Sequence, residues 1–217
     1  TVEDMTCHLA VSPAQDRQFL SEGRLVVLVD PAGEAIRELK PLAVVDAILA
    51  KKNLGTNRSM APITVALGPG FEAGVDVDAV IETKRGHNLG RVLWEGTAAA
   101  NTGIPGIIGG YGKERVIHCP AKGILRNVKK ITDTVSKGEV IAVVETEDGT
   151  VPVEATLDGI LRGLIRDGYA VNVGFKMADI DPRTEEYDNC FTISDKARCI
   201  AGGVIEAILH RKGALGL

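Results

Sequence analysis

The sequence predicts an α/β protein with a parallel sheet in its first half, a small β domain in its second half and a helix at its C-terminus. Three observations lead to this fold class. Apolar runs typical of buried strands alternate with short helical stretches in the first half. Glycine-centred segments recur at a constant offset in the second half. The last segment has helical apolar spacing between a capping serine and a glycine.

Apolar runs in the first half indicate strands that are buried on both faces of a sheet. Residues 24–30 form one run of leucine and valine that ends at Asp-Pro-Ala-Gly, residues 42–46 form a second, and residues 63–67 a third. A short helix is expected over residues 34–39, and a fourth run at residues 79–83 ends in a polar cluster. Ligands of parallel sheets gather at the carboxyl ends of strands, so the segments after these runs are candidate binding segments.

The second half contains an internal repeat. The tripeptide Gly-Ile-Leu at residues 123–125 returns at residues 159–161, and Val-x-x-Gly at residues 135–138 returns at residues 171–174. Both offsets are 36 residues (159 − 123 and 174 − 138). Each copy indicates short strands separated by turn glycines, and two copies related by a pseudo-twofold axis would form a small barrel-like sandwich.

The segments CPAKGIL, DTVSKGEVIAVVE, VPVEATLDGIL and DGYAVNVGFKMADI follow one another in this repeat region. Their order resembles the barrel-sandwich hybrid fold of biotinyl and lipoyl carrier domains, in which the hairpin between the two halves presents one lysine. The corresponding turn, residues 145–150, has an Asp-Gly hairpin signal but no amine. The resemblance implies the carrier fold without the carrier function. Lys137 and Lys176 are alternative attachment points, although each is more simply interpreted as a solvated surface lysine.

The sequence divides into four parts. Residues 1–95 are the α/β part, and residues 96–112 are a glycine-rich connection that is either a linker or a loop packed against the sheet. Residues 113–182 form the β domain. Residues 183–217 contain the C-terminal helix, which is capped by Ser194 and is expected to pack back on the α/β part.

Composition excludes several classes of function. A formal charge of −4 and a pI near 5.6 argue against a nucleic-acid partner, because phosphate binding needs a surplus of lysine and arginine. No apolar run approaches the roughly 20 residues of a membrane span. No secretory signal pattern opens the sequence, so we expect a cytoplasmic location and no membrane partner.

The cysteines Cys7, Cys119, Cys190 and Cys199 form no CxxC pair and have no histidines at zinc spacing. We therefore expect free, buried thiols and no metal site. Cys119 is the cysteine that we single out for a test of reactivity. No cofactor is assigned from the sequence.

Two candidate binding segments follow predicted strands. Lys51, Lys52 and Asn53 lie after the second strand, where a lysine pair beside an asparagine is suited to hold a phosphate or a carboxylate. A solvated helix face is an equally good interpretation. Gly68 and Gly70 follow the third strand and would let backbone N–H groups approach an anion, but they match neither GxGxxG nor a Walker motif. A simple loop at the sheet edge is the alternative.

The strongest candidate segment follows the fourth run. It contains Glu82, Lys84, Arg85, His87 and Arg91, gathered around two glycines. We predict that His87 exchanges a proton and that Glu82 orients its partners, as catalytic residues. The lysine and the two arginines are predicted to bind an oxyanion. An internal ion-pair network is the alternative, since such networks produce the same residue clusters.

Long, ordered segments run through nearly the whole chain: LVDPAGEAIRELKPLAVVDAILAKKNLGT, APITVALGPGFEAGVDVDAVIETKRGHNLGRV, ANTGIPG, RVIHCPAKGIL, GFKMADIDPR and ISDKARCIAGGVIEAIL. They resemble the YqeB family of the selenium-dependent molybdenum hydroxylase system. The resemblance implies an accessory protein of hydroxylase maturation that binds a small anionic ligand, either a nucleotide or a molybdenum-cofactor-related molecule, and a partner hydroxylase. A homo-oligomer is compatible with this role. The alternative is an enzyme that acts on a phosphorylated or carboxylated small molecule, with residues 82–91 as its active site.

Members of the family open with a strand, a glycine-rich turn and a helix, the first unit of a Rossmann-like sheet. The resemblance therefore implies that residues 1–95 form a Rossmann-like domain without its usual first strands. The upstream piece is either missing from this sequence or a separate chain. Self-cleavage would leave Thr1 with a free α-amino group and make it a candidate N-terminal nucleophile, but a truncated start is the simpler explanation.

Overall fold

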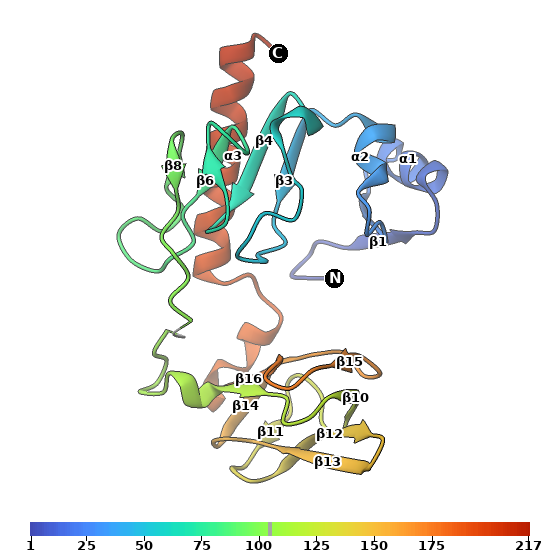
Figure 1. Cartoon of the computed structure of the whole chain (residues 1–217), viewed down its shortest axis with the longest axis vertical. Helices are drawn as coiled ribbons and strands as arrows, with labels where there is room; N and C mark the ends of the chain where they lie inside the picture. The colour runs from blue at the N-terminus through green and yellow to red at the C-terminus, as the bar shows by residue number, and fades with distance from the viewer. Residues whose placement is uncertain (104–105) are drawn as a thin grey trace. The chain divides into compact units, whose positions relative to one another are not determined.

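The computed structural model describes residues 1–103 and 106–217 (Figure 1). The chain has a mixed α/β fold made mostly of strands, with a long C-terminal helix. It forms two compact units: unit 1 contains residues 1–102 and 193–217, and unit 2 contains residues 103–192. The units therefore divide at other positions than the predicted limits after residues 95, 112 and 182. Residues 104 and 105 of the predicted connection lie outside the described residues.

The main sheet of unit 1 has the strand order β3-β4-β6-β7. Its strands are β3 (Ala43–Asp46), β4 (Ile63–Leu67), β6 (Ala79–Ile81) and β7 (Val92–Leu93). The first three are parallel, and β7 is antiparallel to β6. The central strands β4 and β6 are buried, as the sequence predicts, whereas β3 is only half-buried because it lies at the edge of the sheet.

Helix α3 (Asp195–Leu215) covers one face of this sheet, and Figure 1 shows it beside β4 and β6. Its residues Ile200, Val204 and Ala207 pack against Ile63 and Ile81. The predicted cap is confirmed, because the Ser194 hydroxyl accepts a hydrogen bond from the Ala197 N–H. The other face of the sheet is covered by a second apolar cluster, which contains Phe71, Val77 and Ala98. Strands β5 (Glu72–Ala73) and β8 (Gly96–Thr97) form a separate two-stranded antiparallel sheet, and Ala73 of β5 belongs to this cluster.

A separate two-stranded parallel sheet precedes the main sheet. It pairs β1 (Cys7–Ala10) with β2 (Leu25–Leu28), which are connected by α1 (Pro13–Ser21) and followed by α2 (Glu34–Leu39), the short helix that the sequence predicts. The prediction that residues 24–30 are buried on both faces is wrong. Alternate side chains of β2 are exposed, because β2 pairs only with β1 among the described residues and α1 contacts this pair.

Asp78 connects the start of β6 to three other elements. Its carboxylate accepts hydrogen bonds from the N–H and hydroxyl of Thr64 at 2.9 and 3.0 Å. It also forms ion pairs with Arg58, in the 3-10 helix Arg58–Met60, at 2.9 Å and with Arg211 of α3 at 3.2 Å. Burial alone would raise the pKa of Asp78, but the hydrogen bonds from Thr64 and Arg58 and the charge of Arg211 outweigh it, so the pKa lies below its ordinary value.

We expect Asp78→Asn to lower the free energy of unfolding of unit 1 by about 2–3 kcal/mol at neutral pH, because it weakens bonds to buried donors and two arginines. The folded pKa is depressed, so this stabilisation is present above the unfolded value of about 3.9 and is lost as pH falls through the folded pKa. Denaturant unfolding followed by the fluorescence of Trp94, the single tryptophan, measures it at pH 7 and pH 3. The exposed Glu95→Gln is the control, and an equal loss at both pH values would contradict the prediction.

Unit 2 contains two antiparallel four-stranded sheets, ordered β13-β12-β10-β15 and β11-β14-β16-β9. The strands of the first sheet are β10 (Gly123–Asn127), β12 (Val140–Thr146), β13 (Gly149–Glu154) and β15 (Ala170–Val171). Those of the second are β9 (Val116–His118), β11 (Thr134–Val135), β14 (Gly159–Leu164) and β16 (Lys176–Asp181). The 3-10 helices Lys113–Arg115 and Thr184–Cys190 flank them. One apolar core lies between the sheets, and neither sheet closes into a barrel within the described residues.

The predicted repeat corresponds to equivalent strands of the two sheets. β10, β11 and β12 begin 36 residues before β14, β15 and β16 (159 − 123, 170 − 134 and 176 − 140). The middle strand of each copy pairs with the other copy: Val171 lies opposite Gly123, and Val135 lies opposite Gly159. This reciprocal exchange is the relation expected for two copies around a pseudo-twofold axis.

Candidate functional site

The three candidate segments lie at one edge of the main sheet of unit 1. β3, β4 and β6 run parallel, so their carboxyl ends meet at the same edge. Residues 47–57 follow β3, residues 68–71 follow β4 and residues 82–91 follow β6. The position is the one at which parallel sheets most often bind ligands.

The glycines of the middle segment bring the three segments into contact. A side chain on Gly70 would put its Cβ 2.6 Å from the N and Cα atoms of Lys52 and 2.8 Å from the carbonyl carbon of Lys51. A side chain on Gly68 would put its Cβ 2.6 Å from the Thr83 hydroxyl oxygen. Both glycines have positive φ angles, 75° at Gly68 and 107° at Gly70. Glycine is therefore required here for space and for backbone conformation.

The segment after β3 is held in an unusual conformation. Leu49 and Lys51 have φ angles of 59° and 65°, a left-handed conformation that few non-glycine residues adopt. Asp46 fixes this segment, because its carboxylate accepts hydrogen bonds from the Ile48 N–H at 3.1 Å and the Thr56 hydroxyl at 2.6 Å. Asn53, a predicted ligand residue, uses its amide within the segment, where it donates to the Thr56 carbonyl and accepts from the Gly55 N–H.

Glu82 shapes the backbone of the third segment. Its side chain is buried, and its two carboxylate oxygens accept hydrogen bonds from the N–H groups of Lys84 at 2.7 Å and Ala99 at 2.8 Å. His87 is exposed on the turn that follows. The structure gives no hydrogen bond between Glu82 and His87, two described residues, so it does not assemble the predicted catalytic pair.

The basic residues of the third segment differ in their contacts. Arg85 forms two hydrogen bonds, of 2.6 and 2.8 Å, with the carboxylate of Asp195 at the start of α3, and the bond to Asp195 raises the pKa of Arg85. Lys84 and Arg91 are exposed, and Arg91 bonds to Glu82 and Asn88 through its backbone. The pair of Arg85 and Asp195 thus connects the segment to the helix.

Lys196, in the first turn of α3, belongs to the same group and was not predicted. Burial lowers its pKa, and the charges of Arg85 and Lys51 lower it further, whereas Glu82 and Asp195 act in the opposite direction. Lys196 therefore lies within electrostatic reach of two cations from two other segments. One feature of the sequence could have pointed to Lys196. A lysine in the first turn of a helix is unfavourable because it opposes the helix dipole, so such a lysine is a candidate functional residue.

The cysteines do not add a second site. Cys119 is buried, and burial raises the pKa of its thiol, which argues against reactivity. Cys190 is half-buried, and Cys7 and Cys199 are exposed, so the expectation of buried thiols is wrong for these last two. No group of histidine, cysteine, aspartate or glutamate side chains among the described residues is arranged to hold a metal ion.

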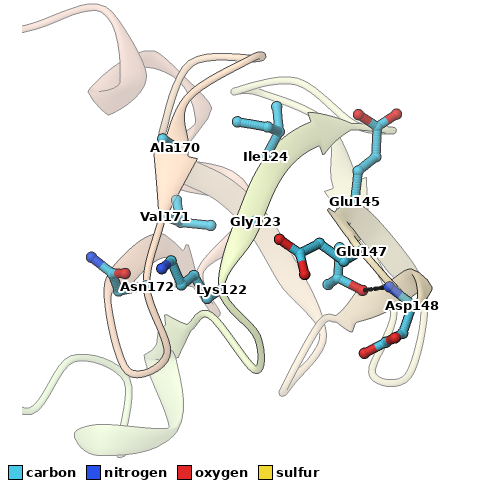
Figure 2. Close-up of a pocket in the computed structure, with 10 residues that line it drawn as sticks. Lys122, Gly123, Ile124, Glu145, Glu147, Asp148, Ala170, Val171 and Asn172 are labelled. Atoms are coloured by element: carbon cyan, nitrogen blue, oxygen red, sulfur yellow. Dashed lines mark hydrogen bonds between the residues drawn. The ribbon is translucent and has the colours of Figure 1, made fainter.

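Unit 2 contains an open pocket of about 650 Å³ at one end of its first sheet. Figure 2 shows Lys122 and Asn172 on one side of this pocket and Glu147 and Asp148 on the other. Glu147 and Asp148 form the two-residue turn between β12 and β13, where a carrier domain would present its lysine. Lys137 and Lys176, the alternative attachment points, are exposed.

Comparison with known proteins gives one close relative. Over 210 residues the chain is 54% identical to the uncharacterized protein YqeB of Escherichia coli K12, which covers 96% of the chain. This similarity supports the YqeB family for this chain. The chain spans 38% of the length of YqeB, and no family model matches it. YqeB is described as an uncharacterized protein, so the similarity assigns no activity to the site.

Solved structures resemble only part of the chain. An aspartoacylase family protein from Mesorhizobium loti is 18% identical, with a TM-score of 0.28 over 31% of this chain and 23% of that protein. The ectoine utilization protein EutE from Ruegeria pomeroyi, in its apo form, is 16% identical, with a TM-score of 0.28 over 40% of this chain and 28% of that protein. No helix in the described ranges is both long and apolar enough to cross a bilayer.

In this relative of YqeB, the sheet edge gathers positive charge from three segments. The charges of Lys51 and Arg85 both lower the pKa of Lys196, and Asp195 forms an ion pair with Arg85. Such an arrangement is suited to hold an anion by charge and hydrogen bonds. We name Lys51, Arg85 and Lys196 the cationic edge.

Proposed function

We propose that this protein binds a small anionic ligand at the cationic edge and serves as an accessory protein of selenium-dependent molybdenum hydroxylase maturation. The observation that carries the ligand-binding part is the convergence of Lys51, Arg85 and Lys196, from three separate segments, at the carboxyl edge of a parallel sheet. The ligand class is a phosphate-bearing molecule, either a nucleotide or one related to the molybdenum cofactor. The maturation role follows from the family resemblance.

The electrostatics of the edge favour an anion. Partial burial and the charges of Arg85 and Lys51 all disfavour the charged form of Lys196. A bound phosphate would offset both costs. The close packing of Gly70 against the Lys51–Lys52 backbone supports a preformed site, because it fixes the segment that supplies Lys51.

The enzyme alternative has weaker support. Its predicted catalytic residues are His87 and Glu82, but both carboxylate oxygens of Glu82 are bonded to backbone N–H groups. A general base must lie within hydrogen-bond reach of its proton donor or acceptor, and Glu82 has its partners already. We therefore assign Glu82 a structural role and favour binding over catalysis.

The finer fold assignments belong to this proposal. We interpret the main sheet of unit 1 as Rossmann-like, supported by three parallel strands and a candidate ligand edge at their carboxyl ends. We interpret unit 2 as a barrel-sandwich hybrid, supported by the exchange of middle strands between its two repeats. In this interpretation unit 1 binds the ligand and unit 2 docks the partner hydroxylase.

Calorimetric titration with inorganic pyrophosphate tests the ligand site. We expect Lys196→Gln to weaken binding at least about tenfold, since one charge-assisted contact is lost. Affinity should also fall as pH rises, because Lys196 has a lowered pKa and deprotonates before an ordinary lysine. Lys212→Gln, in the last turn of the same helix, is the matched control and should bind as the unmodified protein does.

Equal affinity of the Lys196 and Lys212 variants would overturn the assignment of the site. The maturation role has its own readout, the activity of a selenium-dependent molybdenum hydroxylase in cells that carry each variant. Lys196→Gln should lower that activity and Lys212→Gln should not. Normal hydroxylase activity together with lost pyrophosphate binding would overturn the accessory role alone.

A further inference from the structure

The repeat in unit 2 builds the same ion pair twice, in two different surroundings. The offset of 36 residues relates Arg126 to Arg162 and Glu145 to Asp181 (162 − 126 and 181 − 145). Arg126 pairs with Glu145 at 2.9 Å, and Arg162 pairs with Asp181 at 3.2 Å. The Asp181 side chain is only 3% exposed, whereas the Glu145 side chain is 46% exposed. We call the surroundings of Asp181 the closed end and those of Glu145 the open end.

A second arginine fills the closed end. Arg183 donates hydrogen bonds to both carboxylate oxygens of Asp181, at 3.0 and 2.8 Å, so this carboxylate holds two guanidinium groups. The 3-10 helix Thr184–Cys190 follows directly and contacts β14, on which Ile160 is buried. The closed end therefore shows what such a site accepts: an arginine on the carboxylate, and a short turn of chain beside the apolar strand.

The open end lacks this cover, because the chain turns back after β12. Glu147, in the hairpin turn, stands 36 residues before the arginine of the closed end (183 − 147). Glu145 accepts a hydrogen bond from Arg126 through Oε2, and no described residue donates one to its Oε1. Ile124, the counterpart of Ile160, is only half-buried and lines the pocket of Figure 2. One oxygen and one apolar residue are thus left open in the first copy.

The charge of the pocket at the open end fits a cation. Glu145, Glu147 and Asp148 bring three carboxylates to it, and Lys122 is the one cationic side chain among the described residues that line it. Arg126 offsets only the charge of Glu145, so the balance stays negative. Carboxylates bind arginine by charge-assisted and often bidentate hydrogen bonds. The volume of about 650 Å³ lies within the roughly 300–1,000 Å³ of common ligand pockets, so a side chain and its neighbours can enter.

We propose that the pocket at the open end docks an arginine-bearing segment of a partner protein, which takes the place that Arg183 and the 3-10 helix after it hold at the closed end. The partner's arginine donates to Glu145 as Arg183 donates to Asp181, and the two neighbouring carboxylates add attraction. A short turn of the same segment covers Ile124. The inference rests on the docking role proposed for unit 2 and is separate from the cationic edge.

Amide NMR of the whole chain during titration with the peptide acetyl-Leu-Arg-Leu-amide tests the proposal. We expect shifts at residues 122–124, 145–148 and 170–172, which line the pocket. The same peptide with citrulline, the uncharged isostere of arginine, should bind at least about tenfold more weakly, because a charge-assisted contact is lost. Equal binding of the two peptides, shifts outside the pocket, or no binding of the arginine peptide would overturn the proposal.

Glu145→Gln should weaken binding of the arginine peptide about as much as citrulline does. The exposed ion pair that it removes adds little stability, so the variant should fold. Glu154→Gln, exposed at the other end of β13, is the matched control and should bind as the unmodified protein does. Unchanged binding by the Glu145 variant would show that the arginine does not use this carboxylate, which would contradict the proposal.

Hydroxylase activity in cells separates this inference from the proposed function. Glu145→Gln should lower that activity and leave pyrophosphate binding unchanged, because the pyrophosphate site is assigned to unit 1. Lower activity with Lys196→Gln but normal activity with Glu145→Gln would overturn the docking site and leave the ligand-binding role in place.

Discussion

Replacing Gly203 with alanine is expected to lower the free energy of unfolding of unit 1 by about 3 kcal/mol. Gly203 lies in α3 where the helix meets the segment after β6. A Cβ at this position would lie 2.2 Å from the carbonyl oxygen of Gly90 and 3.1 Å from Ile81 Cγ2. The first contact involves backbone, so no side-chain rotation relieves it and the helix must move away from the sheet.

Trp94 fluorescence during denaturant unfolding measures this effect, because the centre of the Trp94 ring lies 4.6 Å from the centre of the His210 ring on α3. Gly202→Ala is the matched control. Gly202 is the preceding helical residue and is exposed, and a Cβ added to it would meet no other atom within 4 Å. That control should gain up to about 1 kcal/mol from the helix preference of alanine. Similar stability of the two variants would show that α3 does not pack this closely.

The same contact positions the cationic edge. Gly90 approaches the backbone of α3 from the other side, where its Cβ would lie 2.6 Å from the Cys199 carbonyl oxygen. Paired glycines thus hold the segment of residues 82–91 against the first half of the helix.

The ion pair between Arg85 and Asp195 lies on an exposed surface and adds little stability by itself. The main effect of this ion pair is to hold Arg85 at the start of α3, beside Asp195, which precedes Lys196 in sequence. Gly203→Ala moves α3 away from residues 82–91, so it should also weaken pyrophosphate binding.

Local patterns explain the parts of the fold that the sequence predicts. Residues 63–67 and 34–39 take the predicted strand and helix, because their apolar spacing and flanking turns act over a few residues. Ser194 caps α3 through a bond to an N–H three residues away. Residues 24–30 have the same apolar character as the central strand β4. The apolar pattern of a strand does not predict how many other strands it pairs with in a sheet. The exposure of residues 24–30 therefore could not be predicted.

In the candidate site, too, the sequence predicts the features that depend on local patterns and misses those that depend on distant contacts. The sequence places Lys51, Gly70 and Arg85 after strands, and parallel pairing brings these strand ends to one edge. Lys196 is separated from Arg85 by more than 100 residues, so no local pattern connects them. The role of Glu82 also depends on a distant partner, the N–H of Ala99. Charge clusters alone do not distinguish a catalytic carboxylate from one that holds a turn.

In unit 2, the glycine that opens each repeat is expected to be irreplaceable. A Cβ on Gly123 would lie 2.0 Å from the Glu145 carbonyl oxygen, and a Cβ on Gly159 would lie 2.3 Å from the Asp181 carbonyl oxygen. The two carbonyls are themselves 36 residues apart (181 − 145), so both glycines serve the same close approach between neighbouring strands. Each alanine variant should lose about 3 kcal/mol or more of the free energy of unfolding of unit 2, since backbone must shift in both.

Hydrogen exchange of the β12 and β16 amides measures this loss in unit 2, which contains no tryptophan. Gly163→Ala is the matched control on β14, because its Cβ would meet only ordinary contacts, the nearest at 3.5 Å. If the two copies of the repeat make equivalent strand contacts, Gly123→Ala and Gly159→Ala should accelerate hydrogen exchange to a similar extent. Gly163→Ala should not accelerate it. A large effect at one glycine and none at the other would mean that the two copies, although alike in sequence, do not carry equivalent strand contacts.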